Sequence, residues 1–168
     1  MLRNYFLLTK PGIIVGNLIT TAAGFILASR GHIDYWLFLA MLIGLGGVIA
    51  SACVFNNYMD RHIDKKMERT KGRALAQGKV SGKSALFYAA FLGIIGLCVL
   101  AKYTNFLTVL TAIAGFVIYV LLYSVGKTRT SYATLIGSVS VAFTSISLAS
   151  LTVPFRCALN CIDISSTF

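Results

Sequence analysis

The sequence predicts an all-α protein, a polytopic bundle of transmembrane helices. Hydrophobic residues make up 57% of its 168 residues and charged residues only 12%, and the mean hydropathy is +0.81. Ordinary soluble domains carry about 25% charged residues. Charge-free stretches recur along the chain, and each is far longer than the ~9–11 residues of a membrane β-strand. We therefore expect helices, because a helix satisfies its own backbone hydrogen bonds within lipid.

Five segments are long enough to cross the hydrocarbon core and contain no Asp, Glu, Lys or Arg. They are residues 12–29, 35–56, 84–101, 105–124 and 132–155. The first begins just after Pro11, which suits the first turn of a helix because its missing N–H would have no helical partner there. The sequence thus predicts five transmembrane helices.

The net charge of +10 is distributed unevenly. Twelve of the fifteen Lys and Arg lie before the first segment, between residues 61 and 83, or just after the fourth segment. Short basic loops stay in the cytoplasm, so we expect a cytoplasmic N-terminus and an external C-terminus. The basic excess therefore indicates orientation in a lipid bilayer, with contact to anionic lipids, and no nucleic-acid interface.

An amide and acidic stripe lies where the second segment ends. Its members recur every four residues: Asn56, Asp60, Asp64 and Glu68. Residues four apart share one face of a helix, so we expect these side chains to line up. Oxygen ligands of this kind suit Mg²⁺, whose shell is usually completed by water and substrate phosphates. We predict Asn56, Asp60 and Asp64 as the metal ligands.

Basic residues accompany the stripe along the following loop. They are Arg61, Lys65, Lys66, Arg69, Lys71 and Arg73. Such groups hold phosphate oxygens by charge-assisted hydrogen bonds, which predicts a polyanion beside the metal. Two alternatives stay open. The acids can simply pair with neighbouring bases at a membrane surface, or they can belong to an ion pathway, although none of the five segments contains a charge.

Several motifs resemble those of the intramembrane aromatic prenyltransferases. The pattern Asn-Asn-x-x-Asp-x-x-x-Asp at 56–64, followed by Glu-Arg-Thr-x-x-Arg at 68–73, is similar to the first aspartate-rich motif of that family. The flanking runs Thr-Lys-Pro-Gly-Ile-Ile (9–14) and Cys-Val-Phe-Asn-Asn (53–57) look most like the bacterial haem O synthase branch. The likeness runs from about residue 7 to 138. Asn57 stands where many members have Asp, and Ala74 where many have Pro.

The resemblance implies an enzyme of the bacterial inner membrane. It would transfer a farnesyl group from farnesyl diphosphate to haem B, giving haem O for terminal oxidases. Asp60 and Asp64 would be the catalytic residues and, with Asn56, would hold Mg²⁺. The diphosphate would be bound by the bases of the loop, Lys65, Arg69, Lys71 and Arg73.

The resemblance also implies a ring of nine helices with two aspartate-rich motifs, of which this sequence carries about half. After Glu68 the only acid is Asp163, so a second Asp-x-x-x-Asp motif is absent. We expect residues 1–138 to be the N-terminal part of a prenyltransferase domain and 139–168 a divergent tail, as in a truncated or frame-shifted product that is inactive alone. An inert membrane remnant and a prenyltransferase acting on a quinone precursor remain as alternatives.

Overall fold

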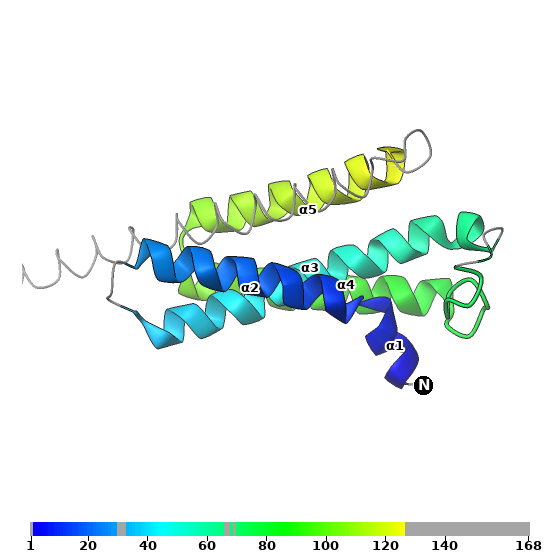
Figure 1. Cartoon of the computed structure of the whole chain (residues 1–168), viewed down its shortest axis with the longest axis horizontal. Helices are drawn as coiled ribbons and strands as arrows, with labels where there is room; N and C mark the ends of the chain where they lie inside the picture. The colour runs from blue at the N-terminus through cyan, green and yellow to red at the C-terminus, as the bar shows by residue number, and fades with distance from the viewer. Residues whose placement is uncertain (1, 30–32, 66–67, 69, 127–168) are drawn as a thin grey trace, which may run out of the picture.

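The structure, a computed structural model, describes residues 2–29, 33–65, 68 and 70–126, with side chains as far as residue 120. This part of the chain is helical and contains no strand (Figure 1). Its helices are α1 (Leu2–Leu8), α2 (Pro11–Ala28), α3 (Tyr35–Asp64), α4 (Gly82–Tyr103) and α5 (Phe106–Gly126). The first four predicted segments are thus confirmed as α2 to α5. The fifth, at 132–155, lies outside the described residues, and the short helix α1 was not anticipated.

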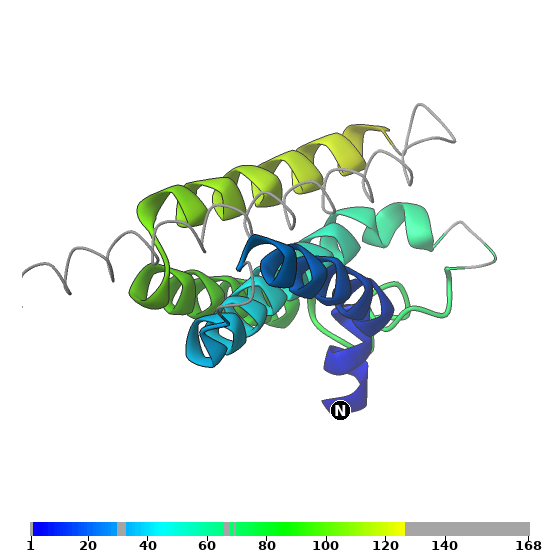
Figure 2. The ribbon, with the colours of Figure 1, turned by 60° about the vertical axis from the view of Figure 1, so that its left-hand side comes forward.

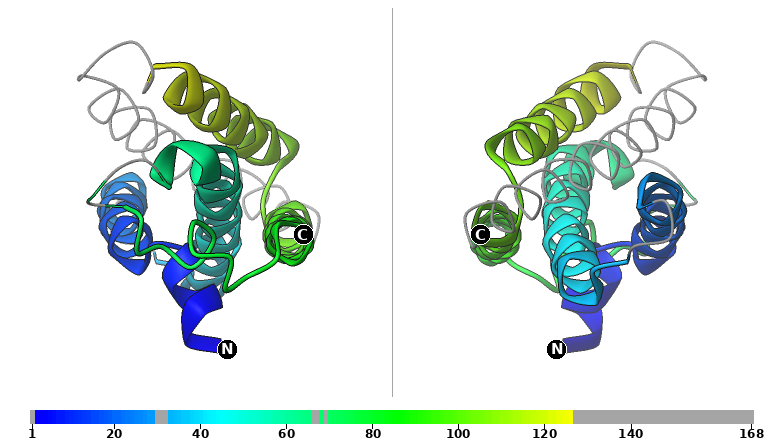
Figure 3. Two further views of the ribbon diagram at one scale, coloured as in Figure 1. Left: turned by 90° about the vertical axis from the view of Figure 1, so that its right-hand side faces the viewer. Right: turned by 90° about the vertical axis from the view of Figure 1, so that its left-hand side faces the viewer.

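Helix α3 is the centre of the bundle. It contacts each of the other four helices, most extensively α4. Seen along the bundle, α3 lies between α2 and α4 (Figure 3). Helix α5 covers α3 on the side opposite α1 (Figures 2 and 3). The side chains of α3 that point toward these neighbours are therefore enclosed between helices.

Small residues allow α3 and α4 to approach closely. A Cβ added at Gly96 would lie 2.6 Å from the carbonyl oxygen of Gly44 and 2.9 Å from the backbone nitrogen of Val48. One turn further along, the Ser51 hydroxyl donates a 2.7 Å hydrogen bond to the carbonyl oxygen of Ala89. Close backbone contact and interhelical hydrogen bonds are what hold helices together in lipid, where the hydrophobic effect between helices is weak.

Three of the described helices, α2, α3 and α4, are long and apolar enough to cross a membrane. The described side chains of α5 add a shorter apolar stretch, Phe106–Val120. Large apolar side chains point outward from these helices, among them Leu27 (81% exposed) and Phe87 (78% exposed). An outward apolar surface of this kind is stable in contact with lipid chains.

The connection between α3 and α4 is packed against the helices. Leu75 and Val80 are buried in one cluster with Leu8 from the end of α1 and Val54 from α3. The same end of the bundle holds the corner between α1 and α2 (Figure 1). This apolar cluster fixes the basic loop over the end of α3, which positions the candidate site.

Candidate active site at the end of helix α3

The predicted stripe forms, and it is buried. Asn56 is 0% exposed, Asp60 3% and Asp64 1%. Helix α3 continues through all three positions and ends at Asp64. The helical rise separates successive members by about 6 Å along the axis. Two carboxylates and an amide are thereby held in a row inside the protein, where polar groups usually have hydrogen-bond partners.

Glu68 does not extend the row, which corrects the predicted stripe of four. Helix α3 ends four residues before it, and the Glu68 carboxylate lies 2.6 Å from the ammonium of Lys71, with 90% of its side chain exposed. The physical reason is the folded loop: the hydroxyl of Thr70 turns back to donate a 3.3 Å hydrogen bond to the carbonyl oxygen of Asp64. For Glu68, the structure therefore agrees with the alternative in which an acid simply pairs with a neighbouring base at the surface.

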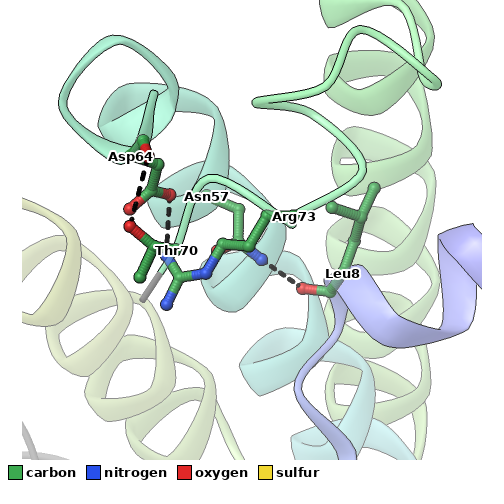
Figure 4. Close-up of polar contacts among 5 residues, drawn as sticks. All are labelled: Leu8, Asn57, Asp64, Thr70 and Arg73. Carbon is green, nitrogen blue, oxygen red and sulfur yellow. Dashed lines mark hydrogen bonds and ion pairs between the residues drawn. The ribbon is translucent and has the colours of Figure 1, made fainter. Parts of the chain in front are cut away.

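Arg73 is a base of the loop that reaches the stripe. Its Nη1 lies 2.7 Å from Oδ2 of Asp64, and the Asp64 side chain is only 2% exposed (Figure 4). A turn held by the 3.0 Å hydrogen bond from the Arg73 N–H to the Thr70 carbonyl brings the guanidinium into place. A positive group thus comes to lie beside the row of oxygen ligands, although it is nine residues away along the chain.

Polar atoms of the stripe lack partners. Among the described residues, Asn56 Oδ1, Asn56 Nδ2 and Asp64 Oδ1 are buried with no hydrogen-bond partner. An unpartnered buried polar atom costs about 1–3 kcal/mol, so such a group needs a ligand or water to satisfy it. The orphaned oxygens fit a small oxygen-seeking cation such as Mg²⁺, with water and a substrate phosphate supplying the remaining ligands. Because successive members of the row are about 6 Å apart along the helix axis, an ion could be shared by neighbours in the row and not by all three side chains. No three His, Cys, Asp or Glu cluster in a metal-ligating arrangement in the described part of the chain.

The other predicted bases are placed differently. Lys65 caps α3 and is exposed, Lys71 is bound to Glu68, and Arg69 lies outside the described residues. Arg61 folds back along its own helix, with its guanidinium carbon 3.9 Å from the centre of the Tyr58 ring. Arg73, by contrast, contacts the stripe directly through Asp64.

Asn57 is a site residue whose role the sequence did not reveal. Its Nδ2 donates a 2.7 Å hydrogen bond to the carbonyl oxygen of Leu8, which ties the end of α1 to α3 (Figure 4). A cavity of about 620 Å³ lies beside this tie, lined by Lys10, Arg73 and Lys79 among others. Lys10 adopts a left-handed conformation with φ of 53°, which is uncommon for a residue other than glycine. The sequence contains one indication of this corner, namely Pro11, which marks the start of α2.

Comparisons with known proteins agree with this architecture. The chain matches the UbiA prenyltransferase family over residues 17–153. It is 54% identical over 143 residues to the protoheme IX farnesyltransferases of Sodalis glossinidius and Yersinia pseudotuberculosis, and the match covers 84% of this chain and 48% of each relative. This chain belongs to the UbiA prenyltransferase family. It spans about half the length of the curated relatives it matches.

Solved structures share the fold. A structure described as that of a digeranylgeranylglyceryl phosphate synthase superposes with a TM-score of 0.71 and 23% identity over 90% of this chain and 54% of that one. A UbiA homolog from Archaeoglobus fulgidus, bound to GPP and Mg²⁺, superposes with a TM-score of 0.69 and 18% identity over 87% of this chain and 54% of that one. The membrane-helical prenyltransferase fold predicted from the sequence is thus confirmed.

Proposed function

We propose that this chain contributes the metal and diphosphate half of a protohaem IX farnesyltransferase. The whole protein would transfer a farnesyl group from farnesyl diphosphate to haem B, forming haem O in the bacterial inner membrane. The observation that carries the proposal is the buried row of Asn56, Asp60 and Asp64 beside the Arg73 guanidinium, in which oxygens of Asn56 and Asp64 have no partner among the described residues. The names of the 54% identical relatives support the choice of donor and acceptor.

The stripe would hold the diphosphate through Mg²⁺. Asp60 and Asp64 would supply the charged ligands and Asn56 a neutral one. When bound, Mg²⁺ would stabilise the negative charge that grows on the diphosphate as its bond to the farnesyl carbon ionises. The A. fulgidus homolog was solved with GPP and Mg²⁺, which supports this pairing of ligand types.

Arg73 would contribute a fixed positive charge to the leaving group. Its guanidinium is already oriented by Asp64, so little reorganisation is needed when the diphosphate arrives. Lys65, Arg69 and Lys71 remain proposed contributors that would close on the diphosphate when it binds. The apolar faces of the helices would shelter the isoprenoid and the developing cation from water.

The proposal is tested by ligand binding to the chain in nanodiscs. We expect a non-hydrolysable farnesyl diphosphate analogue to bind in the presence of Mg²⁺ and to be released by a chelator. Asp60→Ala or Asp64→Ala should reduce Mg²⁺-dependent binding at least tenfold, because a neutral side chain cannot replace a carboxylate as a Mg²⁺ ligand.

Arg61→Ala is the matched control. Arg61 follows Asp60 directly but lies against Tyr58, off the stripe. Its replacement should change the affinity of the analogue by less than threefold. Binding that survives both aspartate changes and ignores the chelator would show that the metal assignment is wrong.

A further inference from the structure

The cavity beside Asn57 is chemically distinct from the acidic stripe. Three of its twelve lining residues, Lys10, Arg73 and Lys79, are basic, and none is acidic. The lining also includes the apolar Leu8, Ile13 and Ala74. Arg73 is already paired with Asp64, and no carboxylate of the lining competes for Lys10 and Lys79, so these lysines could bind an anion without a metal. The apolar lining suits an anion with a hydrophobic body. The cavity therefore has the composition of a site for an amphiphilic organic anion.

Its size and position separate it from the stripe. A volume of about 620 Å³ is far larger than a single oxyanion requires and falls in the range of sites for small organic ligands. Asn57 follows Asn56 on α3, and one residue corresponds to a rotation of about 100° around a helix. The cavity thus flanks the stripe, and Arg73 belongs to both, since it lines the cavity and contacts Asp64.

The cavity wall is built from fixed elements. Asn57 is 3% exposed, and its Nδ2 is held by the Leu8 carbonyl. Its Oδ1 is buried and has no hydrogen-bond partner among the described residues, which leaves an acceptor in the wall for an ammonium or a water. Lys10 is held at the corner of α1 and α2 in a left-handed conformation, which is strained for a residue other than glycine. Strain of this kind is concentrated at sites where a side chain must be positioned.

We propose that this cavity binds the two propionate carboxylates of the haem acceptor, with Lys10 and Lys79 as their principal partners. The inference rests on the proposed function, which has haem B as acceptor. Haem B carries its carboxylates on one edge and its vinyl groups elsewhere on the ring. Holding the carboxylates through lysines next to the stripe, and not through its metal, leaves the vinyl carbon free to meet the farnesyl group. The diphosphate would then be held by the stripe and its metal, and the haem carboxylates by Lys10 and Lys79.

The test compares haem B with its dimethyl ester, in which both carboxylates are neutral. The wild-type chain is placed in nanodiscs of uncharged lipid, and binding is followed by the Soret absorbance, with empty nanodiscs as the blank. We expect the ester to bind at least tenfold more weakly. The double variant Lys10→Gln, Lys79→Gln should weaken haem B binding by a similar factor and leave the ester unchanged.

Lys83→Gln is the matched control, because Lys83 is exposed and does not line the cavity. It should bind haem B as the wild-type does. Thermal unfolding of all variants checks that they are folded. Equal affinity of haem B and its ester, or a double variant that binds haem B normally, would overturn the inference while Mg²⁺-dependent diphosphate binding still supports the proposed function.

Two further outcomes are decisive. A second set of nanodiscs contains phosphatidylglycerol. If this lipid raises the unfolding temperature of the wild-type chain and not of the double variant, while both bind haem B equally, the cavity is a lipid site and the inference is wrong. If haem B does not bind at all although the farnesyl diphosphate analogue does, the haem acceptor is wrong together with this inference.

Discussion

Arg73 Nη1 lies 2.7 Å from Oδ2 of Asp64, while Oδ1 of the same carboxylate has no partner in the described structure. One oxygen of Asp64 thus fixes the loop, and the other remains for a ligand. The same contact therefore holds the α3–α4 connection in place and positions a positive charge in the site. A diphosphate that approaches the unpartnered oxygen through a metal would find the guanidinium already beside it.

Replacement of Arg73 should affect both stability and ligand binding. Arg73→Ala leaves the buried Asp64 carboxylate without its counter-charge, which costs ~3–5 kcal/mol for a fully buried pair. The cost is smaller here because the Arg73 side chain is 31% exposed. We expect the unfolding temperature in detergent to fall by about 5 °C or more, and the farnesyl diphosphate analogue to bind at least tenfold more weakly.

The second ion pair of the same loop is the control for Arg73. Lys71 and Glu68 are 58% and 90% exposed, and exposed pairs contribute ~0–1 kcal/mol. Lys71→Ala should therefore leave the unfolding temperature nearly unchanged. Equal destabilisation by the two replacements would show that the contact between Arg73 and Asp64 does not hold the loop.

The contact between α3 and α4 should not tolerate a larger residue at Gly96. The added Cβ of Gly96→Ala would meet backbone atoms of Gly44 and Val48, and overpacking costs ~1–3 kcal/mol. Gly16→Ala in α2 is the control, because no atom lies within 4 Å of its added Cβ. That replacement should be neutral or stabilising by up to ~1 kcal/mol. Thermal unfolding in detergent distinguishes the two, and equal unfolding temperatures would contradict the close approach.

The charge distribution predicts the orientation of the chain. Reporter fusions after Gly78, in the basic loop, should score as cytoplasmic, and fusions after Phe168 as external. The second fusion also tests the predicted span at 132–155. A cytoplasmic score after Phe168 would show that this segment does not cross the membrane, and an external score after Gly78 would reverse the orientation.

The 168 residues expressed on their own should form no haem O in a synthase-null strain. They span 48% of the relatives' length, and the sequence holds a single aspartate-rich motif. Each 1.36 kcal/mol of missing transition-state stabilisation lowers the rate about tenfold. The measurement is haem extraction and chromatography, with a full-length relative as the positive control. Detection of haem O from this chain alone would mean that one motif suffices.

The sequence alone determined the helical membrane fold and the identity of the stripe. Hydrophobic length and the four-residue repeat are local properties, because each depends only on neighbours within one helix. For this reason α2 to α5 and the alignment of Asn56, Asp60 and Asp64 on one helix followed from the sequence, whereas their burial was seen only in the structure.

Tertiary structure decided which acids and bases share the site. The repeat predicted Glu68 in the row, but Thr70 and Arg73 fold back on Asp64, and Glu68 is left at the surface. The loop adopts this course because Leu75 and Val80 bury themselves against residues far away in the sequence, Leu8 and Val54. Sequence spacing does not predict such long-range packing. The contact of Arg73 with Asp64 and the cavity beside Asn57 could therefore be found only in the folded chain.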